Sequence, residues 1–151
     1  MPIPSDYSIV TFQERHRKQV IALWQACGLI RAWNDPDKDI DRKLKDRNGG
    51  FFVMLYRDPA TEEGKVIGSV MAGYDGHRGS IYYLSISPEH QGSGYGRQLM
   101  NHCEAYLIDL GCPKINLFVR KDNEQASAFY EGMDYILETS LAFGKRLIPD
   151  D

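Results

Sequence analysis

The chain has 151 residues, of which 42% are hydrophobic and 26% charged, with a formal net charge of -3 at pH 7. This length and composition predict one globular domain over residues 1–151, without a linker or internal repeat. The chain has no excess of basic residues, which argues against a nucleic acid as the main ligand. The apolar runs are too short to span a bilayer and no secretion signal opens the chain, so we expect a cytoplasmic protein that binds no membrane. The three cysteines and four histidines do not have metal-ligand spacing, so no metal is expected.

The first third of the chain predicts a strand and two helices. Residues 7–12 alternate well enough for a strand, and residues 14–28 carry the apolar stripe of a helix. A shorter helix is expected over residues 35–47, with Pro36 at its first position. The loop between these helices carries Trp33, which could either line a pocket or pack over the first helix.

The middle of the chain predicts an antiparallel meander. Its three strands are expected at residues 51–56, 65–74 and 80–87. The third strand is rich in β-branched and aromatic residues and is stopped by Pro88, which indicates a buried position in mid-sheet. A tight, glycine-bounded turn containing Asp75 and His77 precedes it.

A glycine-rich loop follows, with the composition of an anion site. It reads Gln91-Gly92-Ser93-Gly94-Tyr95-Gly96-Arg97. Alternating glycines free the backbone to turn its N–H groups toward one point at the start of the next helix, where the helix dipole also favours a phosphate. The P-loop and the dinucleotide fingerprint are both excluded, since neither spacing is met. A phosphate-binding domain of another kind and a glycine turn without a ligand stay open.

After a helix that ends at Gly111, residues 114–120 are expected to form a strand parallel to residues 80–87. A further helix begins at Asn123, and residues 138–148 are predicted to complete the sheet with one or two antiparallel strands. The fold class is therefore α/β, with a mixed, mostly antiparallel sheet of six to seven strands and helices on both faces.

Two separated motifs resemble one family over essentially the whole chain. They are Gln91-x-x-Gly94-x-Gly96 and Asn123-x-x-Ala126-x-x-Phe129-Tyr130. Together they are similar to the GNAT superfamily of N-acetyltransferases, and the Val119-Arg120-x-x-Asn123 run resembles bacterial enzymes that acetylate ribosomal proteins. The resemblance implies a GNAT fold, parallel central strands that splay apart, and acetyl-CoA as the acetyl donor.

The resemblance also implies roles for particular residues. The pantetheine arm would pair with backbone near Leu84, Ser85 and Ile86, and Asn123 would touch it. The pyrophosphate would lie on amides of Gln91, Gly92, Ser93, Gly94, Tyr95, Gly96 and Arg97. Tyr130 matches the general acid, although without the resemblance it would be interpreted as a core tyrosine. A phenol with a pKa near about 10 could protonate a thiolate with a pKa near about 8.5 if the site narrows that gap.

This chain departs from the ribosomal-protein enzymes at Phe118, where they carry a glutamate as general base. The base must then come from another residue or act through water. The candidates are Asp75, His77, Glu89, Tyr82 and Tyr83. Contacts to the substrate are expected from Trp33, Asp75, His77 and Tyr82. A second departure is Asp134, which replaces the glycine that usually ends the fourth helix and tolerates a left-handed backbone.

The sequence thus predicts an acetyl-CoA-dependent N-acetyltransferase that transfers the acetyl group directly to an amine in a ternary complex. The acceptor is a small-molecule or protein amine, and the protein is a monomer or homodimer. The alternatives are a non-catalytic acyl-CoA-binding module that lost its base, and a phosphate-binding domain unrelated to CoA.

Overall fold

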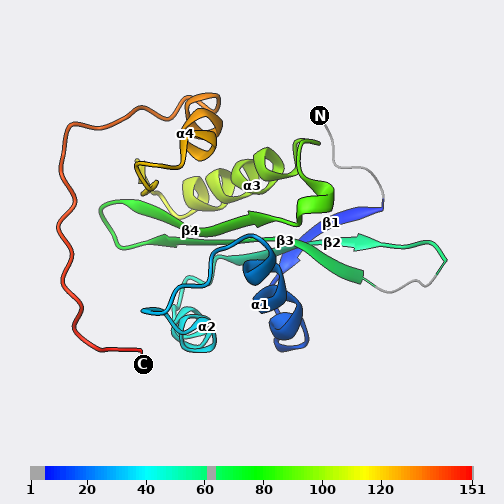
Figure 1. The fold of residues 1–151 in the computed structure, drawn as a ribbon. Coiled ribbons are helices and arrows are strands. Elements are labelled where there is room, and N and C mark those ends of the chain that lie inside the picture. The colour runs from blue at the N-terminus through cyan, green and yellow to red at the C-terminus, as the bar shows by residue number, and fades with distance from the viewer. Residues whose placement is uncertain (1–5, 61–63, 151) are drawn as a thin grey trace.

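A computed structural model describes residues 6–60 and 64–150. Its centre is a five-stranded sheet in the order β1-β2-β3-β4-β5 (Figure 1). The strands are β1 (Tyr7–Thr11), β2 (Phe51–Arg57), β3 (Gly64–Tyr74), β4 (Gly79–Ile86) and β5 (Ile115–Asn116). The first four form an antiparallel meander, and β5 pairs in parallel with β4. The predicted mixed sheet and its strand order along the chain are confirmed.

Helices cover both faces of this sheet (Figure 1). On one face lie α1 (Arg17–Ala26), which follows a 3-10 turn (Glu14–His16), and α2 (Pro36–Leu44). On the other face lie α3 (Tyr95–Asp109), which follows a 3-10 turn (Pro88–His90), and α4 (Glu124–Glu131). The predicted caps of two helices are present, since Asp35 Oδ1 accepts from the Lys38 N–H and Asn123 Oδ1 from the Ala126 N–H.

Two apolar clusters hold these layers together, one on each side of the sheet. Because successive side chains of a strand point to opposite faces, Phe52 and Met54 pack with Leu99 of α3, whereas Phe51 and Val53 belong to the cluster under α1 and α2. All four β2 side chains are buried. Both faces of the central strands are therefore covered, and the packed sheet rigidly positions the residues at its edge.

The pairing of β3 with β4 contains a bulge. Ser69 pairs with Ser85 and Met71 with Tyr82, so Val70 alone faces two residues of β4, Tyr83 and Leu84. Tyr83 has a φ of 56°, an unfavourable backbone conformation for a bulky residue. Two contacts hold it there, which are stacking of its ring on Trp24 at 3.8 Å and a hydrogen bond from its hydroxyl to Asp39 Oδ2 at 2.6 Å.

The parallel pairing of β4 with β5 is brief. Gly79 pairs with Ile115 and Ser80 with Asn116, after which the two segments diverge. The strand predicted over residues 114–120 is therefore only two residues long. This divergence agrees with the expected splayed strands, and it opens the sheet beside the second half of β4.

The prediction of one or two strands over residues 138–148 is wrong. Within residues 64–150 the segment after α4 contains no strand, and the sheet has five strands rather than six to seven. The segment runs apart from the sheet (Figure 1), and both of its ends are held elsewhere. Glu138 forms an ion pair with Lys114, and Asp150 forms one with Arg42 of α2. Asp134, at the end of α4, adopts the left-handed backbone with a φ of 68°.

Candidate active site

A pocket of about 590 Å³ lies where β4 and the segment after β5 diverge. Its walls come from β4, from the loop after α1, from α2, from residues 118–120 and from α4. The lining residues are Leu29, Arg31, Asn34, Asp39, Met71, Ile81, Tyr82, Tyr83, Leu84, Phe118, Val119, Arg120, Asn123, Ala126 and Tyr130. Five predicted residues meet here: Tyr82, Tyr83 and Leu84 from β4, Asn123 at the start of α4 and Tyr130 near its end.

Tyr130 reaches this pocket from the inner face of α4. Its ring packs edge-on against Phe129, at 5.1 Å between centroids, and against Tyr135 at 5.6 Å. Burial, with a smaller contribution from Cys103, raises the pKa of Tyr130 to about 12. The environment therefore widens the difference between the pKa of Tyr130 and that of a thiol instead of narrowing it. The Tyr130 hydroxyl keeps its proton over the whole physiological pH range.

The glycine-rich loop joins the end of β4 to the start of α3. Gly92 and Gly94 have φ values of 84° and 86°, and a Cβ at either position would meet nothing within 4 Å. Open space above two left-handed residues at a helix N-terminus fits a phosphate group that approaches the backbone closely. Gly96 serves another purpose, because its φ is not left-handed and a Cβ there would lie 3.4 Å from the Phe129 ring. It lets α3 and α4 pack closely.

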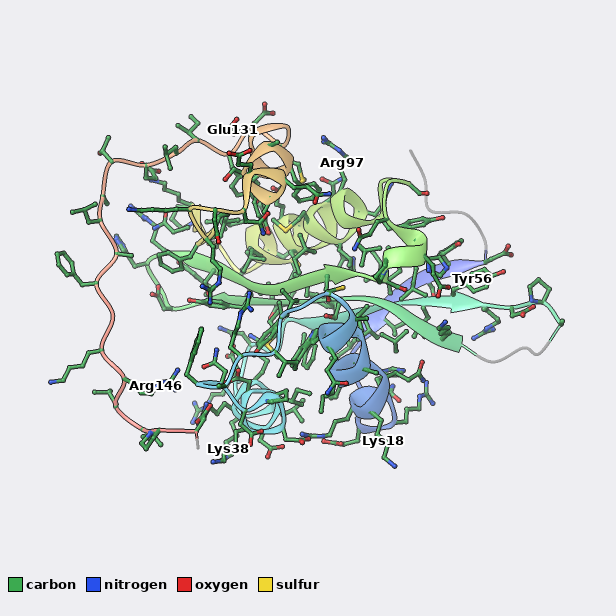
Figure 2. All side chains as sticks on the ribbon, in the orientation of Figure 1. Lys18, Lys38, Tyr56, Arg97, Glu131 and Arg146 are labelled. Carbon is green, nitrogen blue, oxygen red and sulfur yellow. The ribbon has the colours of Figure 1, made fainter. Side chains whose placement is uncertain are left out.

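The long side chains of the loop are engaged within the protein. Gln91 Nε2 donates to the Ile86 carbonyl at 2.8 Å. Arg97 donates to the Gly132 carbonyl at 3.1 Å, and Figure 2 shows it on the same side of the sheet as Glu131. Tyr95 stacks on Tyr7 with ring centroids 4.5 Å apart. An anion at this loop would thus depend on backbone amides, together with the exposed Ser93.

The backbone of β4 offers fewer free groups than the resemblance implies. The Ile86 carbonyl accepts from the Cys27 thiol at 3.2 Å as well as from Gln91. The Ser85 side chain faces inward, with its hydroxyl 2.9 Å from that of Ser69 in the core. The bulge, however, leaves an extra β4 residue outside the regular ladder at Tyr83 and Leu84. The Tyr83 carbonyl at this bulge accepts from the Ser69 hydroxyl at 3.1 Å, so the other backbone groups of the bulge are the candidates to bind a ligand.

Several predicted residues lie away from this pocket. Asp75 and His77 occupy the β3–β4 turn, where Asp75 Oδ1 accepts from the His77 and Arg78 N–H groups at 2.8 Å, and these bonds lower the pKa of Asp75. Glu89 lines a different pocket, of about 550 Å³, with Tyr56 and His90. Trp33 borders the active pocket without lining it.

Asp39, a charged residue of the pocket, was not singled out by the sequence pattern. Asp39 on α2 accepts from the Tyr83 hydroxyl and also pairs with Arg42 at 3.1 Å. Desolvation, followed by this bond to Asp39, raises the pKa of Tyr83. The two partners are 44 residues apart, so no local spacing could have revealed them.

Two arginines line the same pocket from the other side. Arg31 and Arg120 are exposed, and neither forms an ion pair with a carboxylate among residues 6–60 and 64–150. The Arg120 guanidinium lies over the Trp33 ring, 5.5 Å from its centroid. The pocket thus presents two guanidinium groups, whereas its one lining carboxylate, Asp39, is already paired.

Neither a metal-binding cluster nor a membrane-spanning helix is present among the described residues. In the part of the chain that the structure describes, no group of three His, Cys, Asp or Glu residues could hold a metal ion. Within the same residues, no helix combines the length and the apolar character that crossing a bilayer requires.

Comparison with known proteins identifies the family. Residues 13–135 match the family model described as Acetyltransferase (GNAT) family. The chain is 45% identical over 139 residues to an acetyltransferase of Yersinia pestis, covering 92% of this chain and 94% of the relative. It is 46% identical over 143 residues to an acetyltransferase of Sodalis glossinidius, covering 94% and 96%.

Solved structures have the same fold at lower sequence identity. An acetyltransferase from Streptococcus agalactiae superposes with a TM-score of 0.75 at 18% identity, covering 97% of this chain and 93% of that one. The aminoglycoside N-acetyltransferase AAC(6')-Iy, solved in complex with CoA, gives 0.74 at 14% identity, covering 97% and 98%. The ribosomal-protein alanine N-acetyltransferase of Escherichia coli gives 0.67 at 20% identity, covering 84% and 76%.

The chain belongs to the GNAT acetyltransferase family, and the predicted family and GNAT fold are confirmed. The predicted class of enzyme, an N-acetyltransferase that moves an acetyl group to an amine, is confirmed with them.

Proposed function

We propose that this protein transfers an acetyl group from acetyl-CoA directly to an amine, in a ternary complex at the pocket between β4 and residues 118–120. The observation that carries the proposal is that β4, which lines the pocket as far as Leu84, leads directly into the glycine-rich loop. The pocket and the loop are joined by the bulged half of β4, so one ligand could extend from the start of α3 to Tyr130.

The donor would be held mainly by backbone. Its pyrophosphate would contact amides at the N-terminus of the 15-residue helix α3, above Gly92 and Gly94. Its pantetheine arm would pair with β4 backbone beside the bulge and pass Asn123. This binding is supported by the open space over the two left-handed glycines, since a side chain at either position would fill it.

In the proposed reaction, the amine nitrogen attacks the thioester carbon, a C–N bond forms and the carbonyl oxygen becomes an oxyanion. The N–H of Leu84, one of the two β4 residues at the bulge, is a suitable donor to that oxyanion. The C–S bond then breaks and the thiolate leaves. One proton leaves the nitrogen and one reaches the sulfur, so the products are an amide and a free thiol with no net proton change from the neutral amine.

Tyr130 would supply the proton at sulfur. Because its pKa is about 12, complete transfer from an isolated phenol is unfavourable. We therefore assign Tyr130 as a hydrogen-bond donor to the developing thiolate. Tyr130 passes its proton to sulfur as the amine proton is released to water and then regains a proton from water. With Phe118 at the position of the missing glutamate, the amine proton would leave through water or through Tyr82.

The acceptor subsite favours an amine that also carries an acidic group. Arg31 and Arg120 could bind a carboxylate, and the Trp33 ring holds the Arg120 guanidinium in place. Asp39 is less available to attract a polycationic amine, because Tyr83 and Arg42 already occupy it.

The test uses purified protein, acetyl-CoA and matched amines. We expect calorimetry to show acetyl-CoA binding, and release of free CoA thiol to be faster with amino acids or acidic peptides than with their neutral amides. Binding without thiol release across the panel would favour the non-catalytic module. Absence of acetyl-CoA binding would overturn the donor site, and a preference for polyamines would overturn the acidic acceptor.

A further inference from the structure

A buried group of polar side chains lies beneath the bulge of β4, on the side of the sheet that α1 covers. Ser69 of β3 is 0% exposed and Ser85 of β4 is 5% exposed. The indole N–H of Trp24, on α1, donates to Ser69 Oγ at 2.9 Å, and the two serine oxygens lie 2.9 Å apart. Polar groups in a core are costly unless they are hydrogen-bonded, but a satisfied network makes the backbone that it contacts rigid.

Ser69 connects α1 to the backbone of the bulge through a single hydroxyl. A hydroxyl donates once and accepts twice, whereas an indole N–H only donates. Ser69 Oγ therefore accepts from Trp24, and its own hydrogen can go to the Tyr83 carbonyl, 3.1 Å away. The Ser85 hydroxyl can then donate to Ser69, so that all three donors are used. Because Ser85 Oγ is farther from the same carbonyl, at 3.4 Å, Ser69 is the principal donor to Tyr83.

A fixed Tyr83 carbonyl also fixes the direction of the N–H that follows it. The peptide bond between Tyr83 and Leu84 is trans, so its C=O and N–H groups lie in one plane and point in opposite directions. In the sheet, β4 lies between β3 and β5. Because the carbonyl points toward Ser69 on β3, the Leu84 N–H points away from β3, toward the side where β5 diverges and Leu84 lines the pocket.

The backbone conformation at the bulge explains why this support is needed. Tyr83 has a φ of 56°, which is costly for a bulky side chain and persists only where its surroundings hold it. Stacking on Trp24 and the hydrogen bond to Asp39 both act on the Tyr83 side chain. The bond from Ser69 acts on the backbone itself, so it opposes a rotation of the peptide plane that the side-chain contacts would permit.

We propose that Ser69 is a positioning residue for acetyl transfer. Its hydroxyl, oriented by the Trp24 N–H, holds the peptide after Tyr83 so that the Leu84 N–H is aimed at the oxyanion before the reaction begins. A donor that is already in place needs no reorganisation when the charge develops. Ser69 is fully buried and acts only through this peptide. The inference rests on the proposed function, because it assigns the support of the oxyanion donor named there.

Kinetics of three variants test the catalytic role. Ser69→Ala should lower kcat at least about tenfold, toward the roughly 10² to 10³ lost without an oxyanion donor, and should leave both KM values within about twofold. Ser69→Cys keeps the size and a weaker donor, so its kcat should lie between those of Ser69→Ala and the wild type. The matched control is Gln19→Ala, which removes a bond from the Val66 N–H of β3 outside the active pocket. It should lower the melting temperature and leave kcat unchanged.

NMR of isotope-labelled protein tests the contact without turnover. In Ser69→Ala the Tyr83 carbonyl carbon should move upfield and the Leu84 amide signal should shift, whereas Gln19→Ala should change neither signal. If Ser69→Ala does not fold, Ser69→Cys provides the same comparison.

The two measurements distinguish the ways in which the inference can fail. Unchanged signals at Tyr83 and Leu84 would show that Ser69 does not hold this peptide. A kcat that Ser69→Ala leaves unchanged, or that falls equally in Gln19→Ala, would overturn the positioning role. A wild-type protein without turnover would overturn the proposed function and the catalytic role together, and the NMR signals would still decide whether Ser69 holds the peptide.

Discussion

The two sides of the active site are built in different ways. The donor side comes from one continuous stretch, residues 84–97, in which a strand, a bulge, a glycine-rich loop and a helix N-terminus follow one another. The acceptor side is assembled from several separate segments, among them the loop with Arg31, α2 with Asp39 and the segment with Arg120. In the proposed reaction, donor recognition would therefore depend on backbone shape and acceptor recognition on the identity of side chains.

This difference makes the two sides unequally tolerant of change. On the donor side most side chains are replaceable, because the amides belong to every residue, whereas bulk at a left-handed glycine is not tolerated. On the proposed acceptor side, charged side chains on a loop, on α2 and on residues 118–120 would decide which amine fits. The predictions below distinguish donor recognition through backbone shape from acceptor recognition through side chains.

The largest effect is expected at Tyr130, where the two sides meet. Tyr130→Phe keeps the ring between Phe129 and Tyr135 but removes the hydroxyl, so turnover should fall by about 10² to 10⁴ with little change in CoA affinity or melting temperature. The matched control is Tyr135→Phe, which removes a hydroxyl that donates to Glu104 Oε2 and should leave turnover almost intact. Full activity of the Tyr130 variant would show that this residue has only a packing role.

The pH profile sharpens the same prediction. Because burial raises the pKa of Tyr130 to about 12, the proton it donates should persist well above the range of an ordinary tyrosine, whose pKa is about 10. Turnover of the wild-type protein should therefore not fall between about pH 8 and pH 10 through deprotonation of Tyr130. Over this range its pH profile should have the same shape as that of Tyr130→Phe. The raised pKa also means that the neutral phenol stabilises the fold below about pH 10, and that this contribution is lost as the pH rises toward 12.

The second effect concerns donor binding alone. Gly94→Val would place a branched side chain at a φ of 86° in the space proposed for the pyrophosphate, so CoA affinity should fall at least tenfold, or about 1.4 kcal/mol. Gly76→Val is the control, because Gly76 has a φ of 96° and open space but lies in the β3–β4 turn. Calorimetry with CoA should distinguish the two variants, and equal losses would point to strain alone.

The third effect should be smaller and confined to the acceptor. Arg31→Gln and Arg120→Gln each remove an exposed charge, and exposed ion pairs contribute about 0.2–1 kcal/mol, so KM for an acidic amine should rise about twofold to fivefold. The KM for acetyl-CoA should not change. Arg47→Gln, at an exposed arginine outside the pocket, is the control. If both pocket variants leave the KM for the acidic amine unchanged, the arginines do not belong to the acceptor subsite.

The smallest effect is expected at the far end of the C-terminal segment. Arg42 and the Asp35 N–H hold the pKa of Asp150 well below its usual range, so this attachment is present above about pH 4 and is lost as the pH falls further. Asp150→Asn should increase hydrogen exchange near residues 146–149 while CoA affinity stays within twofold. Unchanged exchange would show that the ion pair does not hold the segment.

The sequence predicted the elements whose signals are local. Pro88 ends β4, Asp35 and Asn123 cap α2 and α4, and alternating glycines begin α3, so these features depend on neighbours within a few residues. The pairing of Tyr83 with Asp39 could not be predicted, because it joins two elements through the folded core. The pKa of Tyr130 likewise depends on packing that no motif encodes.

The C-terminal segment shows a different limit of sequence interpretation. The alternation of Leu141 and Phe143 indicates an extended backbone and an apolar side, and the chain is indeed extended there. A pattern of this kind does not say which edge the strand joins, because register and partner come from tertiary contacts. The strands predicted over residues 138–148 are absent within residues 64–150, because no strand of the sheet pairs with this segment.

The hydrogen-bonded series that runs from Tyr83 through Asp39 and Arg42 to Asp150 has a consequence for the order in which the enzyme matures. A chain is synthesised from its N-terminus, so β4, α2 and the donor loop exist before Asp150 does. The strained backbone at Tyr83 can form early, supported by Asp39 and by Trp24, but Arg42 acquires its second carboxylate only after Asp150 has been made. The support that reaches β4 through α2 is thus completed only after β4 and the glycine-rich loop have been synthesised.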